Sequence, residues 1–316
     1  MKAKLLHSVA PMATIFRLLL AGGLIASVCL AKAQVIEGSR AFTYPENDNQ
    51  LIALQRAGGD PAKPGPVKIE FYGWDAFKIT SPSGLTVLFD PWRNDPTGFW
   101  GHWFFTDFPE IPVDVTVSTH AHFDHDATYR SHALMVLDRP VGEYRFSDVK
   151  LMGLADKHQC AGPEHHKWDQ ISVALHFQTC PPNNPLGFDN TIQVMETGGL
   201  KIAIWGDNRP QPSADLDRYL KNVDVLILPI DDSGTLMTYP EVNAVIAHYK
   251  PKAIIPSHYL VKGLSTDVSG FETADGWVKT QDDVRAVSNG EITLTSSDLS
   301  GASQRVYYFG DDRKTK

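Results

Sequence analysis

Cysteine and basic residues are scarce in this sequence. Its 316 residues include three cysteines, and 29 lysines and arginines are outnumbered by 37 aspartates and glutamates, so the formal net charge is −8. An acidic chain lacks the basic patches that nucleic-acid binding requires. We therefore expect a small-molecule substrate and no nucleic-acid partner.

The sequence also lacks a Gly/Ser-rich or charge-rich linker, an internal repeat and a low-complexity tract. Residues 67–316 are therefore expected to form one domain with a single large core. Residues 34–66 contain PAKPGP and little periodicity, and we interpret them as an N-terminal arm. A G-x-S-x-G motif is absent, so the sequence gives no sign of a serine nucleophile.

The apolar run at residues 18–31 is too short for a comfortable membrane span. Three basic residues precede it and Ala31-Lys32-Ala33 follows it, which is the layout of a cleavable signal peptide. Loss of residues 1–33 would lower the net charge to −12, since this segment carries four basic residues and no acid. We expect a periplasmic or secreted protein without stable membrane insertion; a retained anchor or a lipidated Cys29 are the alternatives.

Short apolar segments between turn residues predict an α/β fold. A capping box at Thr238 and Glu241 predicts a helix that ends before Pro251, with one apolar face. That face comprises Val242, Val245, Ile246 and Tyr249. Strands are expected at residues 67–79, 85–90, 113–118, 148–154, 191–207 (a hairpin), 223–230, 253–256, 291–297 and 305–310.

Polar residues follow four of these expected strands: His120, His158, Asp207 and His258. Ligands of layered α/β folds gather beyond strand ends, where loops converge. The stretch STHAHFDHDAT, residues 118–128, adds further metal-binding groups after the first of these strands. Imidazole and carboxylate groups together suit zinc, and also iron or manganese. The sequence therefore predicts a metal site at this edge.

The pattern H-x-H-x-D-H, formed by His120, His122, Asp124 and His125, resembles that of the metallo-β-lactamase superfamily. Asp207 in IWGDN and His258 in IPSHY match the remaining motifs, and GWDAFKI with LFDPW resembles a lactonase-like branch. The resemblance implies a four-layer αββα sandwich with a two-metal centre at one edge.

The resemblance also implies a set of ligands. One ion would take His120, His122 and a third histidine, and the other would take Asp124, His125 and His258, with Asp207 as the bridge. His158 is favoured as the third histidine, His176 is the main alternative, and His165 and His166 are further candidates. The expected cofactors are two divalent ions, Zn²⁺ in the first place and Mn²⁺ or Fe²⁺ as alternatives.

Such a centre implies a hydrolase in which a metal-bound hydroxide attacks an ester, lactone or related bond. Asp124 and Asp207 would orient that hydroxide. Two rival hypotheses remain: a metal-binding protein without catalysis, and a di-iron oxidoreductase. The latter is disfavoured because such proteins tend to carry an acidic ligand where this chain has His122. The substrate and the oligomeric state stay open.

Two departures from the superfamily pattern concern the substrate class: Trp74, where many relatives carry histidine, and Asn208, where many carry a small hydroxyl residue. We expect Asp90 to anchor a loop, Asp126 to cap a helix, and the aromatic residues of 99–108 to line either a core or a pocket wall.

The two cysteines left after signal removal, Cys160 and Cys180, are expected to form a disulfide in an oxidising compartment. They lie near the ends of the segment 159–189, which is longer than the corresponding segment of relatives. We expect the stapled loop to form a wall beside the metals.

Overall fold

The computed structural model describes residues 58–159 and 189–316, which all belong to one compact unit. Residues 1–57 and 160–188 lie outside the described part. The expected signal peptide, most of the arm, the Cys160–Cys180 disulfide and the candidates His165, His166 and His176 all fall there, and they stay predictions.

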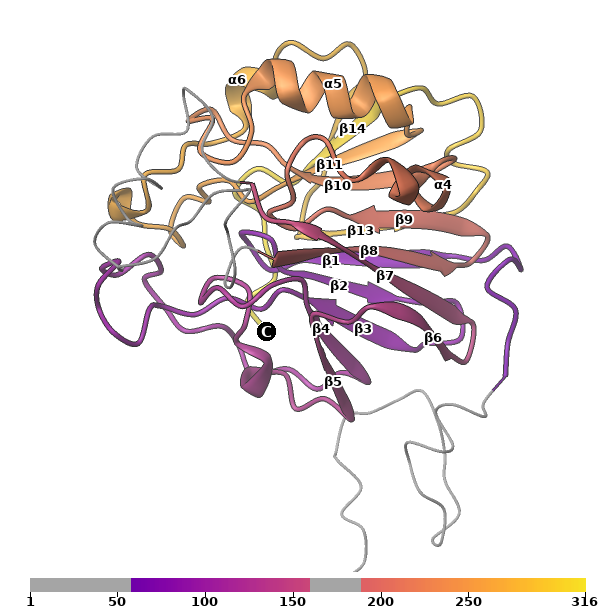
Figure 1. Cartoon of the computed structure of the whole chain (residues 1–316), viewed down its shortest axis with the longest axis horizontal. Helices are drawn as coiled ribbons and strands as arrows, with labels where there is room; N and C mark the ends of the chain where they lie inside the picture. Colours follow the sequence, from indigo (N-terminus) through magenta and orange to yellow (C-terminus); the bar gives the residue numbers. More distant parts are fainter. Residues whose placement is uncertain (1–57, 160–188) are drawn as a thin grey trace, which may run out of the picture. The chain divides into compact units, whose positions relative to one another are not determined.

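The described residues form two mixed sheets (Figure 1). The first has six strands in the order β13 (Glu291–Leu294), β1 (Val67–Phe71), β2 (Phe77–Thr80), β3 (Thr86–Phe89), β4 (Val115–Ser118) and β5 (Met135–Asp138). The second has eight, in the order β12 (Val284–Ala286), β14 (Arg305–Tyr308), β11 (Ala253–Ser257), β10 (Val225–Pro229), β9 (Leu200–Ile204), β8 (Asp189–Thr197), β7 (Val149–Lys157) and β6 (Gly142–Phe146).

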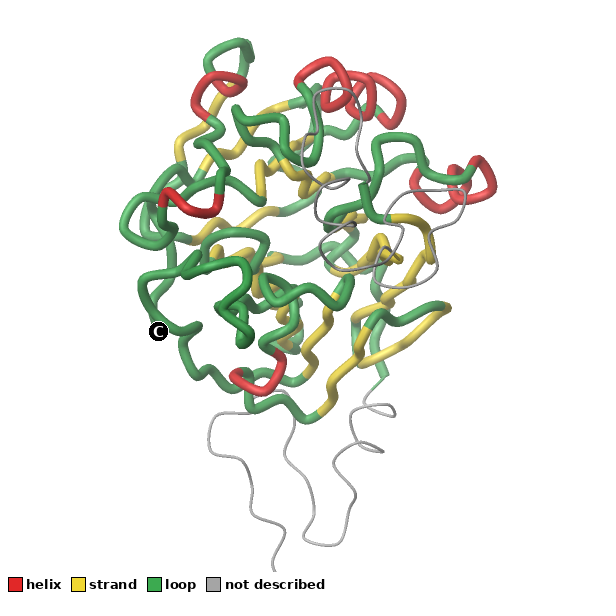
Figure 2. The backbone as a smooth tube through the Cα atoms, turned by 60° about the vertical axis from the view of Figure 1, so that its left-hand side comes forward, coloured by secondary structure: helices red, strands yellow, loops and turns green. Residues whose placement is uncertain are grey.

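Among the described residues the helices are few and short, and long loops link many of the strands (Figure 2). The longest described helix is α5 (Tyr239–Tyr249), which lies next to β10, β11 and β14 in Figure 1. The others are α4 (Asp217–Leu220), α6 (Asp275–Val278) and the 3₁₀ turns η1 (Thr128–Arg130), η2 (Ala214–Leu216) and η3 (Asp267–Ser269). Within the described ranges no helix has the length and apolarity needed to cross a membrane.

Helix α5 forms where its sequence predicts. Thr238 and Glu241 make the reciprocal capping box, and the expected apolar face is buried. Lys250 ends the helix in a left-handed conformation with φ 49°, directly before Pro251, which cannot continue a helix. These local signals agree with the burial that the sheet imposes, so the prediction is confirmed.

The core lies between the two sheets. Phe71 on β1 places its ring 5.7 Å from that of Tyr259 and 5.2 Å from that of Phe309, which follow β11 and β14 of the other sheet. Strand β10, VLILP, is buried at every position, as expected of a strand covered on both faces. The α/β sandwich predicted from the sequence is confirmed as two mixed sheets packed around one core.

One expected strand is wrong. Residues 67–79 do not form one strand but the β1–β2 hairpin, which turns between Phe71 and Phe77. The backbone is left-handed at Gly73, with φ 93°, and at Trp74, with φ 62°. A Cβ atom on Gly73 would lie 2.2 Å from Leu264 Cδ2, so this turn needs glycine for its close approach.

Candidate metal centre

Strand direction brings the predicted site residues to one edge of the eight-stranded sheet. Strands β9, β10 and β11 are mutually parallel, and β7 runs the same way because it is antiparallel to β8, which is antiparallel to β9. His158, Asp207 and His258 follow the ends of β7, β9 and β11. The expectation that residues distant in the sequence meet beyond these strand ends is confirmed.

The H-x-H-x-D-H loop approaches that edge from the other sheet, directly after β4. Asp90 anchors it, as expected: its carboxylate accepts hydrogen bonds from the Thr119 backbone N–H (2.7 Å) and the Thr119 hydroxyl (2.7 Å). The Thr119 carbonyl in turn accepts bonds from the backbone N–H (3.0 Å) and hydroxyl (2.9 Å) of Thr191 on β8. The loop is therefore tied to both sheets.

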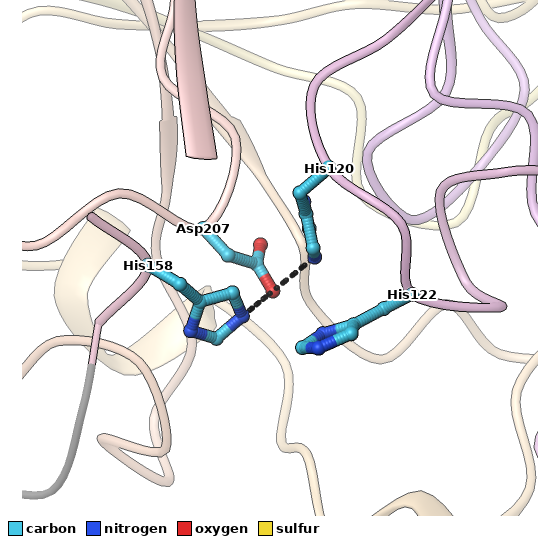
Figure 3. Close-up of side chains that lie close together, drawn as sticks. All are labelled: His120, His122, His158 and Asp207. Atoms are coloured by element: carbon cyan, nitrogen blue, oxygen red, sulfur yellow. Dashed lines mark ion pairs between the residues drawn. The ribbon is translucent and has the colours of Figure 1, made fainter. Parts of the chain in front are cut away.

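The first cluster comprises His120, His122, His158 and Asp207, whose ligand atoms all lie within 4.8 Å of one another. Asp207 Oδ2 lies 3.2 Å from His158 Nε2 and 3.6 Å from His120 Nε2 (Figure 3). His122 is the only partly exposed member, and the other three are buried. Three imidazoles and a carboxylate oxygen form a donor set that zinc prefers.

The second cluster comprises Asp124, His125, Asp207 and His258, all buried. The Nε2 atoms of His125 and His258 lie 3.1 Å apart, and they lie 3.4 and 3.3 Å from Asp207 Oδ1. Asp124 Oδ2 lies 3.6 and 3.3 Å from the same two nitrogens. Ligands at 2.0–2.1 Å from a tetrahedral zinc are separated by roughly 3.3–3.4 Å, and these five separations lie close to that value.

Asp207 belongs to both clusters, and it offers a different oxygen to each. Oδ2 faces His120 and His158, whereas Oδ1 faces His125 and His258. Oδ1 and the buried Nε2 of His120 have no hydrogen-bond partner among the described residues. Buried polar atoms are almost always satisfied, so a bound cation is the partner that these two atoms fit.

Hydrogen bonds at Nδ1 direct the Nε2 atoms of three histidines into the clusters. Nδ1 of His125 can donate to Asp90 Oδ2 (3.0 Å), that of His158 to the Gln159 carbonyl (2.6 Å), and that of His120 to the Thr119 hydroxyl (3.1 Å). An imidazole whose Nδ1 carries the proton has its Nε2 lone pair free for a metal.

Burial dominates the electrostatics of the first cluster. It lowers the pKa of His120 well below the usual range, and it lowers the pKa of His122 to about 4, with the neighbouring histidines adding to the effect. Both rings are therefore neutral near pH 7, which is the form that binds metal.

In the second cluster, two histidines and two aspartates stabilise each other's charged forms. Burial opposes the charged form of His125 and His258, but Asp207 and Asp124 outweigh it and raise the pKa of both imidazoles. The same histidines hold the pKa of both carboxyls well below the usual range against the effect of burial. The carboxylates thus stay ionised beside two imidazolium groups, and a metal ion that binds here would displace a proton from each imidazole.

Residues 68–258 match the family model described as the β-lactamase superfamily domain. The chain belongs to the metallo-β-lactamase superfamily. Curated relatives include the UPF0173 metal-dependent hydrolases of Thermodesulfovibrio yellowstonii (25% identity, 72% of this chain and 91% of the relative) and of Salinibacter ruber (26% identity, 65% and 91%).

Two crystal structures share this superfamily fold. One, from Thermotoga maritima, is classed as a Zn-dependent hydrolase of the metallo-β-lactamase superfamily, with a TM-score of 0.52, 22% identity, and coverage of 77% of this chain and 97% of that one. The other, from Veillonella parvula, is classed as a metal-dependent hydrolase, with a TM-score of 0.51, 16% identity, and coverage of 73% and 100%. At these identities both show the fold alone.

The hairpin turn supplies two residues of this metallo-β-lactamase site that the sequence did not assign to it. Trp74 is fully buried, and its indole N–H donates to Asp124 Oδ2 at 3.0 Å. Asp75 is also fully buried, 3.8 Å from His125 Nδ1, and burial followed by the charge of Asp90 raises its pKa to about 7. The motif GWD was the available signal, but sequence alone does not show which way its side chains point.

An ion pair between the partly exposed Arg209 and the buried Asp156 joins the ends of β7 and β9, and no sequence pattern predicted it. Arg209 contacts both oxygens of Asp156 at 2.7 and 3.1 Å, and Asn208 Nδ2 donates to Oδ2 at 2.9 Å. These residues flank Asp207 and His158, which is bridged to Asn208 through the backbone. Asn208, which appeared as a departure from the superfamily, therefore holds two clustered residues in register.

Other conspicuous residues lie around the centre. Phe104 and Phe108 are core residues, Phe99 and Phe105 are exposed, and the pocket-wall hypothesis for this loop stays a prediction. Asp126 does not cap η1: it pairs with Arg93 at 2.6 Å, because that guanidinium offers two charge-assisted donors. Three further histidines lie outside the clusters and are exposed: His102, His132 and His248.

Proposed function

We propose that this chain is an exported two-metal hydrolase that cleaves an ester, a lactone or a related bond of a small molecule. The proposal is supported by superfamily membership, by relatives named as metal-dependent hydrolases, and by two donor sets with metal-compatible spacing. Export rests on the signal-like segment 1–33, which predicts a periplasmic or secreted protein.

In this proposal His120, His122 and His158 hold one ion, and Asp124, His125 and His258 hold the other. Asp207 bridges them. The observation that carries the proposal is the placement of the Asp207 carboxylate between the two clusters. Its two oxygens lie 3.2–3.6 Å from histidine nitrogens of separate clusters. A carboxylate shared in this way supports two ions rather than one. The histidine nitrogens and aspartate oxygens of the two clusters favour Zn²⁺, with Mn²⁺ or Fe²⁺ as alternatives.

Two divalent ions supply a nucleophile at neutral pH, because they lower the pKa of water to about 7, and they polarise the substrate oxygen. The chain's own residues then orient the attacking group. Asp124 and Asp207 remain ionised, so each can accept a hydrogen bond from the attacking group. His122, the partly exposed ligand, marks the side from which a substrate can approach.

The test measures both the number of metal ions bound per chain and the rate of hydrolysis. We expect the purified full chain, stripped and reloaded with Zn²⁺, to retain two ions and to hydrolyse at least one of an aryl ester, a lactone, a thioester and a phosphoester. The rate should rise with pH through an apparent pKa of about 7. Asp207→Ala should lose metal and more than about 100-fold of the rate, whereas Asp217→Ala, outside both clusters, should keep both.

Each failure points elsewhere. Fewer than one retained ion per chain would refute the metal centre. Two ions without turnover on any of these bonds would favour the metal-binding protein, and reduction of dioxygen by an iron-loaded chain would favour the oxidoreductase. Full activity after prolonged chelation would refute the mechanism.

A further inference from the structure

Trp74 occupies a conformation that its residue type rarely adopts. It is fully buried in the β1–β2 turn and has φ 62°. A bulky residue in the left-handed region is an outlier that surrounding contacts must maintain, and such outliers concentrate at functional sites. His258, a member of the second cluster, has φ 55°, and its backbone N–H donates to the Trp74 carbonyl at 2.9 Å. This hydrogen bond therefore couples the two left-handed backbone conformations.

The Trp74 side chain contacts two of the four residues in the second cluster. Its indole N–H donates to Asp124 Oδ2 at 3.0 Å, and its ring centroid lies 4.7 Å from that of His258. Three aromatic rings confine the indole, at centroid distances of 4.9–5.6 Å: Trp103, Phe104 and Phe271. The ring has little freedom to leave this position, and its hydrogen bond and ring contacts within the described ranges do not reach the first cluster.

We propose that Trp74 is a positioning residue for the second metal ion, a role that rests on the proposed two-metal function. The indole N–H engages one lone pair of Asp124 Oδ2 and so orients the carboxylate toward the ion. The ring supports the imidazole of His258 from the side. Hydrogen bonds of this kind fix the orientation of metal ligands, and their loss typically lowers metal affinity about 10- to 100-fold.

Covalent geometry provides a matched set of variants. In the indole, Nε1 is joined to Cγ through one carbon, and in histidine Nε2 is joined to Cγ in the same way. Trp74→His thus keeps an N–H at this place but removes the six-membered ring. Trp74→Phe keeps a large apolar ring but removes the N–H. A packing role predicts that the phenylalanine variant is the better one, and a hydrogen-bonding role predicts the reverse.

The experiment titrates the stripped full chain with Co²⁺ in competition with a chelator, and reads the visible absorption of each bound ion. Trp74→Phe should weaken the second ion about 10- to 100-fold and leave the first within about two-fold. Trp74→His should recover most of the loss with the absorption bands of the wild type, which shows that the new imidazole does not bind the ion. Trp277→Phe is the control, since that fully buried indole donates to Asn243 Oδ1 (3.0 Å) and not to a ligand.

The outcomes separate this role from the proposed function. A wild-type chain that binds fewer than two Co²⁺ ions would refute the two-metal function itself. A wild-type chain with two ions and a Trp74→Phe variant of equal affinity would refute only the role of Trp74. That role would also fall if Trp74→His were as weak as Trp74→Phe, or if both ions weakened equally, because those results indicate packing or general destabilisation.

Discussion

Asp231 follows β10 at the same edge as the metal centre, and its burial has a measurable effect on stability. Asp231 is 3% exposed, and its Oδ2 accepts hydrogen bonds from the hydroxyl and the backbone N–H of Ser233. Burial nevertheless raises its pKa from 3.8 to about 6. Replacement by asparagine keeps the shape and the acceptor oxygen but cannot ionise.

The sign follows from proton binding. Between about pH 4 and pH 6 the folded carboxyl holds its proton more tightly than the unfolded one, so wild-type stability falls as the pH rises through this window and is level above it. One pKa unit is worth about 1.4 kcal/mol, so the full penalty above pH 7 is about 3 kcal/mol. About 1 kcal/mol of it is already present at pH 4.5, which leaves a change of about 2 kcal/mol between pH 4.5 and 7.5.

The assay is urea unfolding of the metal-free full chain at pH 4.5 and 7.5. The free energy of unfolding of Asp231→Asn minus that of wild type should be about 2 kcal/mol larger at pH 7.5 than at pH 4.5. This difference removes any constant cost of burying the amide. Asp232→Asn, which removes the same charge from an exposed neighbour, should show no such gain. An Asp231→Asn difference that is flat with pH, or that moves in the opposite direction, would refute the reasoning.

Three further predictions concern the centre and its surroundings. Arg209→Ala should lower the free energy of unfolding by about 1–2 kcal/mol, since the Asp156 carboxylate loses a charged partner but keeps its bond from Asn208, and a urea midpoint unchanged from wild type would contradict this. His258→Ala should remove one of two bound ions in elemental analysis while the exposed His248→Ala retains both, and equal losses would argue against the ligand assignment. Peptide mapping without reductant should recover Cys160 linked to Cys180, and free thiols at both positions would end the disulfide prediction.

The part of the site that sequence could predict is the part set by local pattern and strand direction. The H-x-H-x-D-H motif is contiguous, and the parallel strands β9, β10 and β11 bring their carboxyl ends together whatever their loops do. His158 and His258 directly follow strands, so their meeting with Asp207 required only the correct order of elements. Asp90 was predictable as a loop anchor for the same reason, although its bond to His125 was not.

The part that could not be predicted depends on contacts between distant segments. Residues 67–79 have the composition of one strand, and the turn at Trp74 exists because contacts from His258 and the aromatic loop stabilise a backbone that propensity disfavours. Asp156 and Arg209 are 53 positions apart and meet only after β7 and β9 have joined one sheet. Strand β5 was missed because its apolar run, residues 133–137, is too short for periodicity to distinguish a strand from a helix segment.

The centre draws its ligands from both sheets, and this makes metal geometry a property of the sandwich. The H-x-H-x-D-H loop follows β4 of the first sheet, whereas His158, Asp207 and His258 follow strands of the second. A displacement between the sheets would change the Asp207 distances in both clusters together. The bond from Thr191 on β8 to the Thr119 carbonyl spans that junction, and Asp90 anchors Thr119 on the side of the first sheet. Because Asp207 faces both clusters at once, the spacing of the two proposed ions depends on how rigidly this junction is held, and less on any single ligand.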